Sequence, residues 1–256
     1  MLLAERLAAD EAVFAGWSAI PDPMTIEALA GTAFDTVLLD MQHGGHSEES
    51  ILRCLAPAIA AGKPGIVRIP VGRFDMASRA LDYGAEAVIA PMINSVEDAE
   101  AFAASMKYPP MGERSWGVSI VAARDGQSDN LKRLKTANAE TLSFAMIETR
   151  RAYEALDGIL AVEGIDAVFI GPSDLSIAWT NGAAVNPKLP DMSDAIADIV
   201  RKARAAGKHV GIYLVNMADA GPLSEMGIKL FGFGAEAKFM SVGADALLGE
   251  AKASLG

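Results

Sequence analysis

The chain has 256 residues, of which 51% are hydrophobic, 21% are charged and 6% are aromatic. This composition excludes a disordered or low-complexity protein, and the length suffices for one large α/β barrel or for two small domains. The 22 basic and 33 acidic residues give a net charge of −11. That charge argues against a nucleic-acid-binding protein, because phosphate binding needs a basic surface.

The apolar and β-branched runs of the chain predict eight strands with helical segments between them. The predicted strands span residues 13–20, 36–41, 65–70, 85–92, 141–148, 166–171, 208–215 and 228–234. Eight strands alternating with helices are typical of a (β/α)8 barrel, whereas the alternative, a doubly wound sheet, usually has fewer strands. No linker-like tract divides the chain, so residues 1–256 are predicted to form a single barrel domain.

The segments between the predicted strands contain residues typical of helix ends and two long predicted loops. A helix over 95–106 begins at Ser95 with acidic residues in its first turn, and a helix over 193–207 ends in basic residues and Gly207. Two long loops, over 107–130 and 172–190, are expected to shape the catalytic mouth.

The single cysteine and the apolar runs indicate where the protein resides. Cys54 excludes an internal disulfide and a cysteine-rich zinc site, and its apolar surroundings are typical of a buried small residue. No apolar run approaches the length of a membrane span, and acidic residues interrupt the N-terminal MLLAERLAADEAV. We therefore expect a cytoplasmic protein that is neither exported nor inserted into a membrane.

Polar residues at the carboxyl ends of barrel strands are expected to face the active site. They are Asp40, Gln42 and His43 after the second strand, Arg68 in the third, Glu148 after the fifth, and Ser173 and Asp174 after the sixth. Arg68 stands in an apolar strand, so it needs an anion such as a substrate carboxylate or enolate, or a structural ion pair with a barrel acid.

His43 follows Asp40 by three residues, so that carboxylate is expected to orient the His43 ring as a general base. His46 and His209 have weaker claims, because one lies further along the loop and the other begins a strand, away from the mouth.

Glu148 and Asp174 come from neighbouring strands, so their carboxylates are expected to lie within reach of one ion. An all-oxygen pair suits Mg²⁺ or Mn²⁺, with Co²⁺ as a further candidate, and water and substrate would complete the coordination. The alternative is that Glu148 pairs with an arginine and that Asp174 caps the following helix.

The lysines argue against imine catalysis, which needs a desolvated lysine facing the site. Lys63, Lys208 and Lys229 lie at or before strand starts, and the other lysines lie in predicted helices or loops. The glycines of FGFGAE, after the eighth strand, are interpreted as a tight turn rather than a phosphate site.

Several segments together resemble the HpcH/HpaI aldolase family, the class II pyruvate aldolases that include 2,4-dihydroxyhept-2-enedioate aldolase. They are LLDMQHGGHS, GIVRIP, APMINSVEDAE, YPPMGERSWG, IETRRAYEALDGILAVEGIDAVFIGPSDLS and LFGFGAEAKFM, and the resemblance covers residues 14–245. It implies a (β/α)8 barrel whose last helix packs on a neighbouring subunit, in a hexamer built as a trimer of dimers.

The resemblance also implies roles for individual residues. A divalent metal would be held by Glu148 and Asp174, and Arg68 would bind the keto oxygen and stabilise the enolate. His43, helped by Asp40 and Asp82, would move the proton of the substrate hydroxyl. The substrate would be held by backbone N–H groups of Ser173 and Asp174 in a pocket lined by Trp17 and Leu214. Members of the family often have Glu where Gln42 stands and Gln where Met146 stands.

These residues predict a metal-dependent aldolase that joins or cleaves a 2-oxo acid, pyruvate or hydroxypyruvate, and an aldehyde. One alternative is cleavage of an acyl-CoA in the manner of citrate lyase β subunits or malyl-CoA lyases, which would need a basic entry for the nucleotide. Another alternative is a non-catalytic barrel that binds a metal-chelating dicarboxylate.

Overall fold

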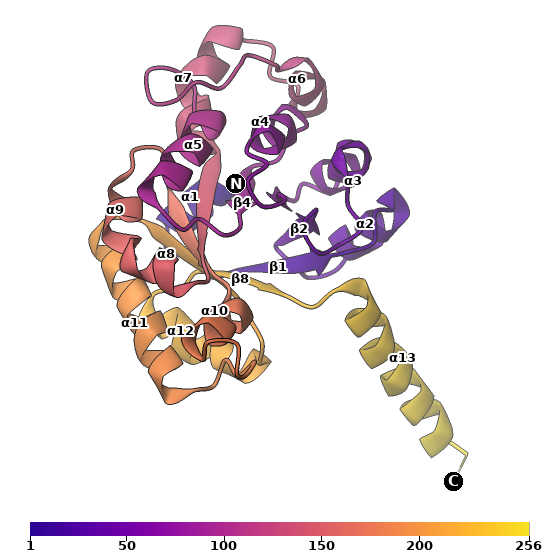
Figure 1. Ribbon diagram of the computed structural model, residues 1–256. Coiled ribbons are helices and arrows are strands. Elements are labelled where there is room, and N and C mark those ends of the chain that lie inside the picture. Colours follow the sequence, from indigo (N-terminus) through magenta and orange to yellow (C-terminus); the bar gives the residue numbers. More distant parts are fainter. Residues whose placement is uncertain (256) are drawn as a thin grey trace.

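The computed structural model describes residues 1–255, in which eight parallel strands close into one barrel in the order β1 to β8 (Figure 1). The strands are β1 (Val13–Ser18), β2 (Thr36–Asp40), β3 (Gly65–Arg68), β4 (Ala87–Ala90), β5 (Leu142–Ile147), β6 (Ala167–Ile170), β7 (His209–Tyr213) and β8 (Leu230–Phe233). Each lies within its predicted segment, so the prediction of a (β/α)8 barrel is confirmed.

Helices surround the barrel and return the chain from one strand to the next (Figure 1). They are α1 (Leu3–Ala8), α2 (Pro23–Ala30), α3 (Glu48–Ala60), α4 (Asp75–Asp82), α5 (Val96–Met106), α6 (Ser119–Asp125), α7 (Asn130–Glu140), α8 (Arg150–Glu154), α9 (Leu156–Ala161), α10 (Pro172–Trp179), α11 (Pro190–Ala205), α12 (Ala220–Met226) and α13 (Glu236–Ala253), with a short 3-10 helix η1 (Met217–Asp219) before α12.

The strands are apolar on both faces because the sheet separates two cores. In β2, Leu38 belongs to the core inside the barrel, whereas Val37 and Leu39 belong to the core between the strands and the helices. All three side chains are fully buried. This double burial explains why the strands appear in the sequence as continuous apolar runs rather than as alternating ones.

The two helices with clear signals form where they were predicted. Ser95 Oγ accepts a hydrogen bond from the Asp98 N–H at 3.2 Å and so begins α5, and Gly207 has a φ of 72° just after α11. α11 begins at Pro190, three residues before the predicted start.

The two long loops were predicted wrongly in part. The segment 107–130 contains α6, and the segment 172–190 begins with α10. The first segment also lies at the opposite end of the barrel from the mouth: Lys107 Nζ donates to the carbonyls of Asn138 and Thr141, just before β5. The reason is that α5 runs antiparallel to the strands and carries the chain back to their amino ends.

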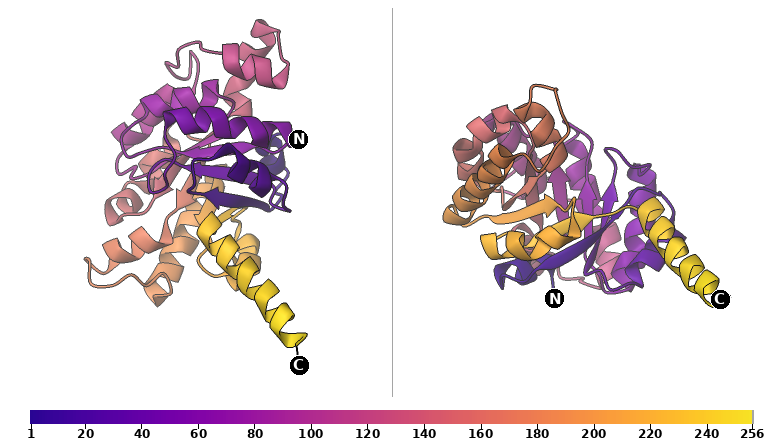
Figure 2. Two further views of the ribbon diagram at one scale, coloured as in Figure 1. Left: turned by 90° about the vertical axis from the view of Figure 1, so that its right-hand side faces the viewer. Right: turned by 90° about the horizontal axis from the view of Figure 1, so that it is seen from below.

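α13 projects away from the barrel in both views of Figure 2. Only its first turn is anchored: Glu236 is buried, and the Phe239 ring packs against Phe34 with centroids 5.4 Å apart. The apolar side chains Met240, Val242, Leu247 and Leu248 are each more than half exposed. Among the helices of residues 1–255, none has the length and apolarity needed to span a bilayer.

Candidate active site

A cavity of about 280 Å³ opens at the carboxyl ends of the strands. Residues at the ends of seven strands line it: Trp17, Ala19, Asp40, Arg68, Met146, Gly171, Pro172, Ser173, Asp174, Tyr213, Gly234 and Ala235. This is the end of a barrel at which active sites form, because the strand ends and the loops after them converge there. The structure thus brings together five residues predicted for the site: Trp17, Asp40, Arg68, Ser173 and Asp174.

Asp40 and Arg68 form a buried ion pair in the floor of the cavity. Arg68 Nε donates to Asp40 Oδ1 at 2.9 Å, and Arg68 Nη2 donates to Asp40 Oδ2 at 2.6 Å. The register of the sheet places these residues side by side on β2 and β3. Burial alone would raise the pKa of Asp40, but the hydrogen bonds and charge of Arg68 outweigh it and hold the pKa below the ordinary 3.8.

The contact with Asp40 is the structural ion pair that was one of the two alternatives for Arg68. It leaves open the other alternative, contact with a substrate anion. Within residues 1–255, no acceptor engages Arg68 Nη1, and Arg68 lines the cavity. Its guanidinium also lies over the Trp17 ring, 4.8 Å from the ring centroid. Arg68 is therefore held in position by Asp40 and Trp17 while it retains N–H groups for an anion.

Asp40 contacts the backbone of His43 rather than its ring, which corrects the expected contact. Asp40 Oδ1 accepts from the N–H groups of Gln42 at 3.0 Å and His43 at 3.3 Å. The carboxylate thus shapes the turn after β2, and the His43 side chain is exposed beside the mouth. Gln42 Oε1 is buried without a hydrogen-bond partner in the described part of the chain.

Glu148 lies just behind the cavity wall, at the end of β5. Its Oε1 accepts from the Met92 N–H at 2.8 Å, and a Cβ on Gly171 would come within 2.6 Å of its Oε2. Met92 has a φ of 54°, a left-handed conformation that is costly for a side-chain-bearing residue. The carboxylate therefore occupies space that only glycine at position 171 leaves free.

Glu148 and Asp174 fit a divalent cation. Burial raises the pKa of Glu148 to about 7, and the negative charge of Asp174 also acts to raise it. Glu148 is buried and Asp174 is exposed in the mouth, and carboxylates whose charges repel are the donors that a hard cation neutralises. In residues 1–255 no group of three or more His, Cys, Asp and Glu side chains is arranged for a metal, so water and ligand oxygens would fill the other positions.

Neither structural alternative for this pair is realised in the described residues. Glu148 has no ion pair with an arginine. Asp174 does not cap α10, because the N-terminus of this helix has no side-chain capping hydrogen bond. Ser173 and Asp174 instead lie in the first turn of α10, where backbone N–H groups have no acceptor within the helix. These N–H groups and the helix dipole favour a carboxylate at this place.

The aromatic wall of the cavity combines an expected residue, Trp17, with an unexpected one, Tyr213. Trp17 Nε1 donates to Asp40 Oδ2 at 3.2 Å. The Tyr213 ring packs edge-on against Trp17 at 5.1 Å, and its Oη donates to the Gly234 carbonyl at 3.2 Å. Burial raises the pKa of Tyr213. The signal that could have found Tyr213 is its position near the carboxyl end of a predicted strand.

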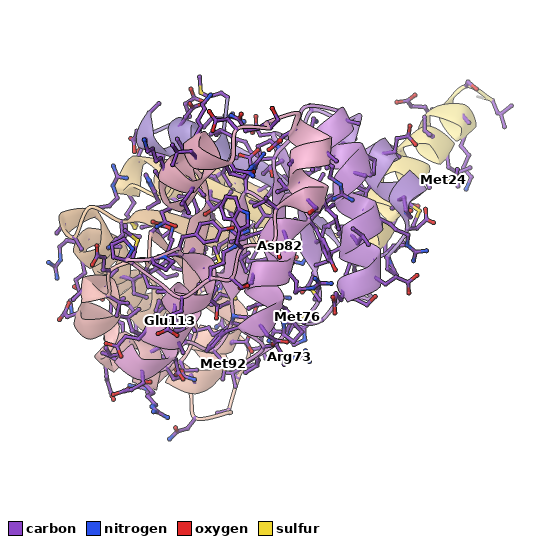
Figure 3. All side chains as sticks on the ribbon, turned by 90° about the horizontal axis from the view of Figure 1, so that it is seen from above. Met24, Arg73, Met76, Asp82, Met92 and Glu113 are labelled. Atoms are coloured by element: carbon purple, nitrogen blue, oxygen red, sulfur yellow. The ribbon has the colours of Figure 1, made fainter. Side chains whose placement is uncertain are left out.

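Leu214 and Asp82 were also predicted for the site, but in the described chain neither lines the cavity of the mouth. Leu214 faces the helices outside the barrel, in a neighbouring cavity. Asp82 ends α4 and binds Arg114 Nη2 through its Oδ1 at 2.8 Å. Figure 3 shows Asp82 well separated from Met92, the residue whose N–H binds Glu148. α4 runs antiparallel to the strands, so its last residue lies at their amino ends.

The other histidines have structural contacts or lie far from the mouth. His46 is buried, where Ser18 Oγ lies 2.9 Å from its Nε2, and Ser18 also donates to Glu236 at the start of α13. Burial lowers the pKa of His46. His209 begins β7, as expected, at the opposite end of the barrel.

The glycines after β8 form the predicted tight turn. Gly234 has a φ of 88° just before α13, a conformation that glycine adopts readily.

Comparison with known proteins finds similarity in sequence and in fold along most of the chain. A model of the HpcH/HpaI aldolase/citrate lyase family matches residues 14–241. A hydroxypyruvate/pyruvate aldolase of Rhizorhabdus wittichii is 37% identical over 199 residues, 78% of either chain. A 4-hydroxy-2-oxo-heptane-1,7-dioate aldolase of Salmonella heidelberg is 34% identical over 232 residues, 90% of this chain and 87% of that one. The crystal structure of an HpcH/HpaI aldolase from Desulfitobacterium hafniense has a TM-score of 0.87 and 28% identity, covering 98% and 96% of the two chains.

Proposed function

Because the chain belongs to the HpcH/HpaI aldolase/citrate lyase family, we propose that it is a class II aldolase that joins and cleaves a 2-oxo acid and an aldehyde. The 2-oxo acid is pyruvate or hydroxypyruvate, the compounds that name its aldolase relatives. The chain is then a carbon–carbon lyase. The observation that carries this proposal is that Arg68 and Asp174 line one cavity, with Glu148 directly behind it at Gly171.

Glu148 and Asp174 would hold the divalent cation, Mg²⁺ or Mn²⁺, or else Co²⁺. When bound, the cation supplies Lewis-acid stabilisation of negative charge on the oxygen of the 2-oxo acid. The N–H groups of Ser173 and Asp174, at the start of α10, bind the substrate carboxylate. This arrangement directs the oxo group of the substrate toward Arg68.

Arg68 stabilises the enolate that forms when the bond between C3 and C4 breaks. Its guanidinium is already held by Asp40 and Trp17, so little reorganisation accompanies the reaction. In the cleavage direction His43 removes the proton of the C4 hydroxyl, the electron pair of the C3–C4 bond passes to the enolate, and the aldehyde leaves. Asp40 places the backbone of His43 through its contact with the N–H group.

The exposed face of α13 supports a homo-oligomer. Four apolar side chains of α13 face solvent in the single chain, and a second copy of the chain would cover them. We propose that α13 packs on a neighbouring subunit, in a hexamer built as a trimer of dimers, and that Asp82 acts within that assembly. The acidic surface and the buried Cys54 suit a cytoplasmic enzyme with small-molecule partners and no nucleic-acid partner.

The test is consumption of pyruvate, and separately of hydroxypyruvate, with glycolaldehyde and acetaldehyde as acceptors. EDTA should abolish the reaction, and added Mg²⁺ or Mn²⁺ should restore it. Cleavage of an acyl-CoA thioester without any aldol reaction would contradict the proposal. Stabilisation of the fold by oxalate and metal without turnover would also contradict it, and would indicate a binding protein.

A further inference from the structure

A second cavity, which we call the side groove, lies outside the barrel between the end of β7 and helices α11 and α12. Its volume is about 360 Å³, larger than that of the cavity in the mouth. Apolar side chains form its walls: Ile196, Ile212, Leu214, Pro222, Leu223 and Met226. Its charged residues are Lys188 and Asp219, and both are exposed at the surface.

The side groove adjoins the reaction cavity. Tyr213 and Pro172 line both cavities, so each presents one side to the mouth and another to the groove. β7 explains this arrangement, because neighbouring residues of a strand point to opposite faces. Tyr213 belongs to the interior of the barrel, whereas Ile212 and Leu214 belong to the core under the helices.

The wall between the cavities is held in place. Tyr213 Oη donates to the Gly234 carbonyl at 3.2 Å, and its ring packs edge-on against Trp17. Beyond Tyr213 and Pro172, which line both cavities, the side groove presents apolar surface, and its charged residues Lys188 and Asp219 are exposed to solvent.

We infer that the side groove binds an apolar substituent of the aldehyde partner, either an unbranched alkyl chain or a phenyl ring. This inference rests on the proposed function. Arg68 and the backbone N–H groups at the start of α10 suit the anionic 2-oxo acid in the mouth, and the apolar groove suits a hydrocarbon tail that gains free energy on leaving water. A hydroxylated or carboxylated tail would lose hydrogen bonds to water there without replacement.

The test compares kcat/KM for addition of pyruvate to glycolaldehyde, propanal, hexanal and phenylacetaldehyde. In each reaction C3 of pyruvate loses a proton and bonds to the aldehyde carbon. The π electrons of the aldehyde carbonyl pass to its oxygen, which takes up a proton and becomes the new hydroxyl. We expect kcat/KM to rise by about fourfold for each methylene between propanal and hexanal. Equal values for the two alkyl aldehydes would overturn the inference.

A variant that fills the groove provides the second arm. Met226 is 41% exposed on α12, so Met226→Trp is expected to fold and to occupy the groove. It should remove the preference for hexanal over propanal and leave the glycolaldehyde rate unchanged. Leu134→Trp is the matched control, because Leu134 is 43% exposed on α7 and does not line either cavity.

The outcomes separate this inference from the proposed function. A metal-dependent reaction of glycolaldehyde without any chain-length preference among the alkyl aldehydes overturns the inference about the side groove but not the proposed function. The same holds if Met226→Trp keeps the preference for hexanal. Failure of every aldehyde, glycolaldehyde included, overturns both. The glycolaldehyde rate in the same preparation also reports whether the Met226→Trp protein is folded.

Discussion

Arg68 and Asp40 form a two-point contact in the floor of the mouth, with donor–acceptor distances of 2.9 and 2.6 Å. The contact fixes the guanidinium plane and leaves Nη1 without an acceptor among the described residues, while Arg68 lines the cavity. A guanidinium held in this way is prepared for a developing negative charge, because its orientation is already set before substrate binds. The same contact makes each residue of the pair important for stability.

Arg68→Ala is expected to reduce kcat by at least about 10²-fold, because the enolate loses a preorganised donor. The substitution also leaves the Asp40 carboxylate buried without its cation, which should cost about 3 kcal/mol of unfolding free energy. Steady-state kinetics and urea denaturation measure the two effects. Far-UV circular dichroism should show a retained fold, and a variant with the wild-type rate would contradict the assignment of Arg68.

Asp40→Asn is expected to destabilise the protein in a pH-dependent way. The pKa of Asp40 is lowered in the folded state, so its ionisation stabilises the fold above the ordinary pKa of 3.8. That stabilisation is lost as the pH falls from there through the lower folded pKa. The difference in unfolding free energy between wild type and Asp40→Asn should therefore be smaller at pH 3 than at pH 6. A difference that is independent of pH would show that the ion pair does not control stability.

Gly171→Ala is expected to weaken metal binding. The added Cβ would lie 2.6 Å from Glu148 Oε2 and 3.0 Å from Met146 Cε, so the carboxylate has to move. Isothermal titration with Mn²⁺ should show at least about tenfold weaker binding. Gly221→Ala, on α12, is the matched control, because no atom lies within 4 Å of its Cβ position. Equal affinities in both variants would argue that Glu148 does not bind the metal.

Lys107→Met is expected to lose stability without loss of chemistry. The Lys107 side chain is fully buried, and its Nζ donates to two carbonyls and to Asp166 at 2.6 Å, at the amino end of the barrel. Loss of these contacts should cost about 3 kcal/mol of unfolding free energy. The kcat of the folded fraction of Lys107→Met should be unchanged. In a separate experiment on the wild type, borohydride added with pyruvate should not inactivate the enzyme, because no lysine forms an imine with the substrate. Inactivation would indicate an imine on a lysine.

The double variant Leu247→Glu and Leu248→Glu is expected to lower the oligomeric mass. Both side chains are more than half exposed on α13, beyond its anchored first turn, so the barrel itself should remain folded. Buried carboxylates would oppose packing of α13 on a neighbouring subunit. Light scattering coupled to gel filtration measures the mass. An unchanged mass would remove α13 from the interface.

The strand order and much of the mouth were predictable from the sequence. Strands that are buried on both faces appear as apolar runs, and polar residues at the ends of such runs stand out. Asp40, Arg68, Ser173 and Asp174 were found in this way, and all four line the cavity. Glu148 was found by the same signal and lies behind the wall at Gly171.

Only the tertiary structure decided which of these groups meet and which surfaces they share. Arg68 could have met any barrel acid, and the register of β2 and β3 pairs it with Asp40 rather than with Glu148. The direction of α4 carries Asp82 to the amino ends of the strands, and the alternation along β7 turns Tyr213 inward and Leu214 outward. Local patterns determine which segments are strands and which of their ends are polar. Contacts between distant segments depend on strand register and helix direction, which arise only when the barrel closes.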